Sequence, residues 1–121
     1  MPYRIAKQFN FEAAHKLNNV PEDHKCGNLH GHSYKLILYF ESDELDGDWI
    51  FDFAELDTFK NSHLSGIMGL DHSDLNEELD FETTAENLAK YFYDVLKKMW
   101  FPQLSKVRLW ETDKAYAEYW E

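Results

Sequence analysis

Three histidines and one cysteine are the residues whose types and spacing could do chemistry. His30 and His32 stand two positions apart in a segment with strand-like alternation, so their side chains point to the same face. His15 ends an earlier alternating segment, and Cys26, the only cysteine, lies four residues before His30. Three neutral imidazole nitrogens can fill three positions of a tetrahedral zinc ion and leave the fourth to water or substrate. The pattern predicts an open zinc site; the alternative interpretation is a hydrogen-bonded or solvent-exposed histidine pair.

Three further residues, the pair Asp71 and His72 and the single Glu111, could take part in the same chemistry. Asp71 and His72 are adjacent in a polar segment, and a carboxylate stabilises the charged imidazole used in general acid–base catalysis. The alternative for this pair is a solvated turn or a cap, which is the commoner structure. Glu111 falls on the apolar side of its predicted strand, where a carboxylate needs a partner. A ligand with two parallel N–H donors, such as the edge of a pterin, could supply one; the alternative is a strand end open to water.

Length and charge restrict the fold class and the partners. The chain has 121 residues, which indicates a single domain over 1–121. Its net charge is −11, with 23 acidic and 12 basic residues, and this argues against a nucleic-acid partner because phosphate backbones require a basic face. A lone cysteine cannot form an internal disulfide. The sequence contains no apolar run of the roughly 18 residues that a membrane span needs. We therefore expect a cytoplasmic protein with neither a signal peptide nor a membrane partner.

Hydrophobic periodicity predicts six elements in the order ββααββ. The predicted strands cover 3–15, 30–41, 107–111 and 115–120, and the predicted helices run from Asp52 to about 66–69 and from a Thr83/Glu86 capping box to Pro102. This order gives an α+β fold in which two helices cover one face of an antiparallel four-stranded sheet. So small a sheet has open edges, and we expect subunits to pair into an oligomeric β-barrel.

Six separated motifs resemble the 6-pyruvoyl-tetrahydropterin synthase family. They are Phe11-Glu12-Ala13-Ala14-His15, Cys26-x-x-x-His30-Gly31-His32, Asp52-Phe53, Leu70-Asp71-His72, Thr83-Thr84-Ala85-Glu86-Asn87 and Glu111-Thr112. They occur in order across nearly the whole chain, which on this basis is identified as a single 6-pyruvoyl-tetrahydropterin synthase-like domain. The short gap between Cys26 and His30 is similar to that of the 6-carboxytetrahydropterin synthase branch, which serves queuosine (7-deazaguanine) biosynthesis.

The resemblance implies a tunnelling fold (T-fold), in which trimers close β-barrels that stack as a homohexamer with active sites at subunit interfaces. The metal ligands that it implies for Zn²⁺ are His15, His30 and His32. The proton-transfer residues that it implies are Cys26, as the general base, and Asp71 and His72, from a neighbouring subunit. The substrate-binding candidates are Glu111, Thr83 and Thr84 at the pterin ring, and Lys16 and Lys25 at the triphosphate.

The reaction implied converts 7,8-dihydroneopterin triphosphate to 6-carboxy-5,6,7,8-tetrahydropterin, acetaldehyde and triphosphate. Zinc would act as a Lewis acid on the side-chain hydroxyls, and the thiolate of Cys26 would remove and return protons. Three alternatives stay open. One is the sister reaction that forms 6-pyruvoyl-tetrahydropterin, another is a three-histidine zinc hydrolase with a metal-bound hydroxide, and the third is a non-enzymatic oligomer that binds zinc and pterin.

Overall fold

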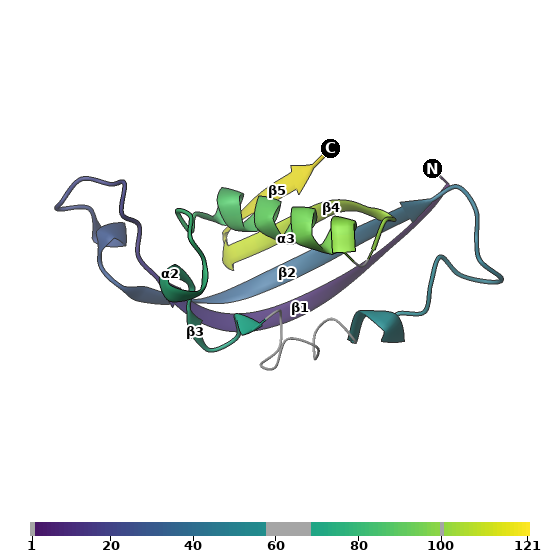
Figure 1. The fold of residues 1–121 in the computed structure, drawn as a ribbon, viewed down its shortest axis with the longest axis horizontal. Coiled ribbons are helices and arrows are strands. Elements are labelled where there is room, and N and C mark those ends of the chain that lie inside the picture. Colours follow the sequence, from purple (N-terminus) through teal and green to yellow (C-terminus); the bar gives the residue numbers. More distant parts are fainter. Residues whose placement is uncertain (1, 58–68, 100) are drawn as a thin grey trace.

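The computed structural model describes residues 2–57, 69–99 and 101–121. A long hairpin comes first, a short strand and two helices follow, and a second hairpin ends the chain (Figure 1). The strands are β1 (Tyr3–His15), β2 (His30–Ser42), β3 (Ser73–Asp74), β4 (Leu104–Thr112) and β5 (Ala115–Trp120). The helices are the 3-10 helix η1 (Lys25–Gly27), α2 (Leu75–Glu78) and α3 (Ala85–Met99). Among the described residues, no helix is long and apolar enough to cross a membrane.

The hairpin of β1 and β2 follows the alternation of its sequence. Phe9, Phe11 and Ala13 on β1 are buried, while the residues between them point away from the core. On β2, every second side chain from Tyr34 to Phe40 is fully buried. The two strands pair antiparallel over their full length, and the predicted strand pair is confirmed.

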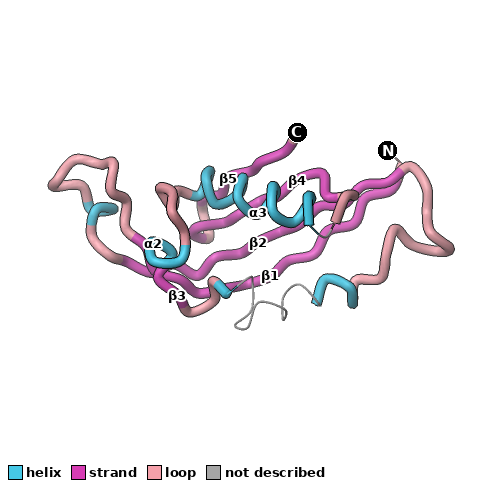
Figure 2. Tube along the Cα trace, viewed as in Figure 1, coloured by secondary structure: helices cyan, strands magenta, loops and turns pink. Residues whose placement is uncertain are grey.

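The sheet has five strands, in the order β3-β1-β2-β4-β5, and it is not closed (Figure 2). The predicted sheet of four mainly antiparallel strands therefore lacked one strand. The additional strand, β3, pairs parallel to β1 through Ala13 and Ala14 only. A strand of two residues has no periodicity to detect, which is why the sequence did not reveal it. The outer edge of β1 is open beyond these two residues within the described part of the chain.

Helix α3 covers one face of the sheet and completes the core. Its buried side chains Leu88, Phe92 and Leu96 contact the sheet, and Phe92 meets the ring of Phe11 edge-on at a centroid distance of 5.9 Å. Phe11 in turn stacks on Tyr34 at 4.8 Å. Aromatic pairs of this geometry add to the stabilisation from burial alone. The apolar stripe predicted for this helix is therefore core, as expected.

The two predicted helix starts have different outcomes. Asp52 caps a helical turn over residues 54–57, because its carboxylate accepts a hydrogen bond from Ala54 N at 3.0 Å; the rest of that predicted helix lies outside the described residues. For α3 the predicted cap, Thr83, was wrong. The side chain of Thr84 fills that role by accepting from Asn87 N at 3.2 Å, which leaves Thr83 for another contact.

Candidate metal centre and active site

Strands β1 and β2 bring the three predicted metal ligands together at one end of the sheet. The antiparallel register places His15 directly opposite His30, and His32 opposite Ala13 on the same pair of strands. The ring centroids are 4.7 Å apart for His15 and His30, 5.1 Å for His15 and His32, and 4.8 Å for His30 and His32. One nitrogen of each ring lies within 4.8 Å of the other two. The three imidazoles therefore form a single group of convergent donors.

Hydrogen bonds orient two of these rings. The Nδ1 atom of His15 is 2.8 Å from the carbonyl oxygen of Thr83 and 3.1 Å from its Oγ1. The Nδ1 atom of His30 is 2.7 Å from the carbonyl oxygen of Asn28. A carbonyl can only accept, so each Nδ1 carries the proton and donates it, which leaves the lone pair of each Nε2 free. Partners of this kind fix the tautomer and the ring direction of metal-binding histidines.

The third histidine supplies a test of whether a metal fits. The Nε2 atom of His32 and the hydroxyl of Tyr34 are buried without a hydrogen-bond partner in the described part of the chain. An unpaired buried polar atom needs an explanation, and for the His32 nitrogen, which faces two other imidazoles, a shared metal ion provides one. Burial also lowers the pKa of His15 and His32 from the ordinary 6.5, because desolvation disfavours the charged form. Neutral imidazoles are the form that binds zinc. The residues present therefore fit a metal ion held by three nitrogen ligands.

Glu111, near the end of β4, lies beside this group. Its carboxylate oxygens are 3.8 Å from His15 Nε2 and 3.9 Å from His32 Nε2, and its side chain is 29% exposed. Tyr34 lies next to the same two histidines, with ring centroids 6.2 Å from His15 and 5.5 Å from His32. Burial, reinforced by the Glu111 charge, raises the pKa of Tyr34, so its hydroxyl stays protonated. The site thus offers a partly exposed carboxylate next to the histidines.

Cys26 lies in the connection of residues 16–29 that joins the two histidine-bearing strands. It belongs to η1, and its free thiol is half-buried. The carbonyl oxygen of Cys26 accepts a hydrogen bond from Leu17 N at 2.7 Å, so the two arms of the connection are held together. Connections of this length are often functional. The structure places Cys26 on the loop that leaves and re-enters the sheet at the histidines.

Asp71 and His72 form a pair on the outer side of β1. Their side chains are 3.1 Å apart, and Asp71 also accepts a hydrogen bond from Glu12 N at 2.9 Å. His72 has a positive φ of 60°, an uncommon conformation for a residue other than glycine, and its side chain is 78% exposed. The pair lies outside the histidine group of its own chain, although a shallow hollow of about 460 Å³ is lined by both His72 and His32.

The remaining predicted substrate-binding residues divide into two kinds. Thr83 is fully buried against His15, and Thr84 caps α3, so both threonines already have partners within the chain. Their contact with a pterin remains a prediction. Lys16 is the first residue of the connection that carries Cys26, and Lys25 directly precedes Cys26 in η1. Both are exposed, so an anionic group could reach them.

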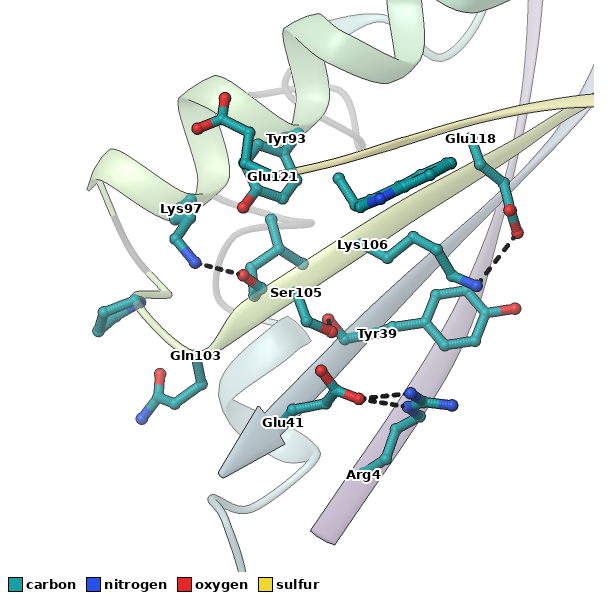
Figure 3. A pocket seen from close by; sticks show the side chains of 13 residues that line it. Arg4, Tyr39, Glu41, Tyr93, Lys97, Gln103, Ser105, Lys106, Glu118 and Glu121 are labelled. Atoms are coloured by element: carbon teal, nitrogen blue, oxygen red, sulfur yellow. Dashed lines mark hydrogen bonds and ion pairs between the residues drawn. The ribbon is translucent and has the colours of Figure 1, made fainter. Parts of the chain in front are cut away.

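A second hollow, at the opposite end of the sheet, does not compete as the active site. It also has a volume of about 460 Å³, and Figure 3 shows that Arg4 is paired with Glu41 and Lys106 with Glu118. Arg4 donates to Glu41 at 2.8 Å, and Lys106 lies 3.3 Å from Glu118. The ammonium group of Lys97 donates to a backbone carbonyl at 2.7 Å. The two ion pairs neutralise their own charges, and the described residues that line this hollow provide no group of convergent metal ligands.

Sequence reasoning missed the residues that support the metal ligands. The contact between Thr83 and His15 joins positions 68 residues apart, and the acceptor from Asn28 is a backbone atom. Neither has a spacing signal in the sequence. Tyr34, by contrast, continues the alternation of His30 and His32, so the strand pattern predicts that it shares their face.

The mainly antiparallel sheet, its covering helix and the histidine group together define a tunnelling-fold subunit that could hold a metal. Comparison with known proteins agrees. The model of the family described as 6-pyruvoyl tetrahydropterin synthase matches residues 4–121. The 6-carboxy-5,6,7,8-tetrahydropterin synthases of Haemophilus influenzae and Aquifex aeolicus are 30% and 34% identical to this chain, covering 98% and 100% of it and 99% of each relative.

A solved structure extends the likeness to three dimensions. The 6-pyruvoyl tetrahydropterin synthase of Caenorhabditis elegans superposes with a TM-score of 0.82 at 25% identity, covering 98% of this chain and 95% of that one. The chain therefore belongs to the 6-pyruvoyl tetrahydropterin synthase family, and the predicted resemblance is confirmed.

Proposed function

We propose that the protein is a zinc-dependent 6-carboxy-5,6,7,8-tetrahydropterin synthase of queuosine biosynthesis. It would convert 7,8-dihydroneopterin triphosphate and water to 6-carboxy-5,6,7,8-tetrahydropterin, acetaldehyde and triphosphate. The observation that carries the proposal is the group of three convergent histidines with the Glu111 carboxylate beside it. The names of the Haemophilus influenzae and Aquifex aeolicus relatives support the choice of product.

His15, His30 and His32 would hold the zinc ion through the nitrogens that their hydrogen bonds leave free. When bound, zinc supplies a Lewis acid at the side-chain hydroxyls of the substrate, which makes the protons on the adjacent carbons easier to remove. Glu111 would accept two N–H bonds from the pterin ring, in the bidentate manner of a carboxylate. The partial exposure of Glu111 beside the histidines supports this role, because a pterin ring bound there would bring the side chain of the substrate toward the metal ligands.

Cys26, as the thiolate, would take a proton from the substrate and return it at a neighbouring carbon. Asp71 and His72 would assist as a proton relay, with the carboxylate orienting the imidazole. Because His72 is exposed on the outer side of β1, the pair can also face the site of an adjacent subunit. Lys16 and Lys25, exposed on the connection that carries Cys26, are the proposed contacts of the triphosphate.

The open sheet edges support a homohexamer with active sites at subunit interfaces. Among the described residues, β1 is paired on its outer side only at Ala13 and Ala14, and β5 has no strand on its outer side. Exposed edges of this kind are protected when strands of another subunit add to them. We propose that trimers close barrels in this way, and that the enzyme works in the cytoplasm on a small-molecule pterin.

The second candidate is the sister activity, a 6-pyruvoyl-tetrahydropterin synthase. The family description and the Caenorhabditis elegans structure both carry that name, and the latter shares the fold of this chain at 25% identity. Both activities would use the same metal ligands and the same carboxylate, so only the product separates them.

Substitution of the cysteine tests the proposal. Cys26→Ala should keep one zinc per chain and lose turnover of 7,8-dihydroneopterin triphosphate, because the general base is gone while the metal ligands remain. His30→Gln should lose zinc, and Glu22→Ala, an exposed change on the same connection, should behave as the unmodified protein. Full turnover by Cys26→Ala would favour a metal-hydroxide hydrolase. Zinc and pterin binding without any product would favour a non-enzymatic oligomer.

A further inference from the structure

Residues 76–83, which run from within α2 toward the start of α3, hold the base of the connection that carries Cys26. Asn76 binds both peptide groups of Lys16: Lys16 N donates to Asn76 Oδ1 at 2.8 Å, and Asn76 Nδ2 donates to Lys16 O at 2.9 Å. A single side chain thus fixes the first residue after β1.

Glu82 holds the next part of the connection. Its carboxylate accepts from Asn18 N at 2.9 Å and 3.1 Å, through its two oxygens, and from Asn19 N at 2.6 Å. Its own carbonyl accepts from Asn87 Nδ2 at 2.9 Å, which ties Glu82 to α3. Bonds from N–H groups to a carboxylate are shorter and about twice as strong as those between neutral groups. The sequence separation of 64 residues means that this carboxylate joins two distant parts of the chain.

One more hydrogen bond links this contact to the thiol-bearing residue. Leu17 N donates to Cys26 O at 2.7 Å, so the consecutive N–H groups of Leu17, Asn18 and Asn19 bind Cys26 and Glu82. The residue after Glu82 is Thr83, which binds the ring of His15. The adjacent residues Glu82 and Thr83 therefore fix the loop of Cys26 and the metal ligand His15 relative to each other.

We infer that Glu82 is a positioning residue that sets the place of Cys26 relative to the three histidines. The inference rests on the proposed function, in which Cys26 transfers protons. Proton transfer requires hydrogen-bond distances, and a displacement of about 1 Å far from the reacting atoms can cost about 10²-fold in rate. Glu82 acts through the backbone of Asn18 and Asn19 and need not contact the substrate.

The test compares Glu82→Ala and Glu82→Gln with Glu78→Ala, a matched loss of an exposed glutamate on the neighbouring helix α2. Two quantities are measured on the zinc-loaded protein: kcat and KM for 7,8-dihydroneopterin triphosphate, and the rate at which iodoacetamide alkylates Cys26. Glu82→Ala should lower kcat about 10- to 100-fold with little change in KM. It should also raise the alkylation rate by about fivefold or more, since a loop without its anchor opens more often.

Two comparisons separate positioning from general stability. Glu82→Gln keeps one acceptor oxygen, so kcat and alkylation should lie between those of the unmodified protein and of Glu82→Ala. Leu36→Val, a core change, should lower the unfolding temperature without altering either quantity. Unchanged kcat and unchanged alkylation in folded Glu82→Ala would overturn the inference. If that variant does not fold, Glu82→Gln decides by the same criteria.

The outcome for Cys26 itself distinguishes this inference from the proposed function. If Cys26→Ala keeps full turnover, the proposed role of the thiol fails, and the alkylation rates still show whether Glu82 anchors the loop. If Cys26→Ala is inactive while Glu82→Ala has the kcat and the alkylation rate of the unmodified protein, the positioning role alone fails.

Discussion

Thr83→Val tests how far the metal site depends on the partner of His15. Thr83 is fully buried, and valine has nearly its shape, so the packing stays while Oγ1 is lost. The His15 Nδ1–H is shared between that oxygen at 3.1 Å and the Thr83 carbonyl at 2.8 Å, and the shorter contact remains. The loss of one neutral hydrogen bond costs about 0.5–1.5 kcal/mol. Since about 1.4 kcal/mol is a factor of ten, zinc affinity should fall about 2- to 10-fold.

This magnitude lies below the usual effect of removing a partner of a metal ligand, about 10- to 100-fold, because the backbone carbonyl still orients the ring. The zinc dissociation constant can be measured by competition with a chromogenic chelator. Thr84→Val is the matched control: it removes the α3 cap, which should cost about 1 kcal/mol of stability, and should leave zinc affinity unchanged. Equal zinc affinities for Thr83→Val and the unmodified protein would refute the role assigned to Thr83.

Three further predictions concern stability, pH and substrate binding. Leu36→Ala, at a fully buried position, should lower the free energy of unfolding by about 2–5 kcal/mol in urea; a loss below about 1 kcal/mol would show that the site collapses around the cavity. The metal-free protein should lose stability as the pH falls through 6.5, because burial lowers the pKa of His15 and His32 and the unfolded chain then binds more protons; a constant unfolding temperature from pH 8 to pH 5 would contradict this. Glu111→Gln should raise KM about 10- to 100-fold, because the new amide N–H group would face an N–H group of the pterin instead of accepting from it. The control Asp113→Asn changes an exposed side chain and should leave KM unchanged.

The strand pair and its histidines could be predicted because their signals are local. Alternation along β1 carries the apolar face into His15, and alternation along β2 carries it into His32. An antiparallel pair joined at that end must bring the two together. The position of Glu111 on the apolar side of β4 was visible for the same reason, since alternation alone places it.

The supporting contacts could not be predicted, because they join segments that are distant in the sequence. A capping-box pattern selects Thr83 as the cap of α3, but the structure uses that residue for His15 and moves the cap to Thr84. Likewise, nothing in the sequence distinguishes Glu82 from the other acidic residues, because its contact with Asn18 forms only in the folded chain. Local sequence propensity does not predict these side-chain partners, because tertiary contacts determine them.

The most direct test of the central claim is to identify, by mass spectrometry, the products that the zinc-loaded protein forms from 7,8-dihydroneopterin triphosphate. We predict 6-carboxy-5,6,7,8-tetrahydropterin together with acetaldehyde and triphosphate. Formation of 6-pyruvoyl-tetrahydropterin would assign the chain to the sister activity, and unreacted substrate would contradict a catalytic role for the histidine site.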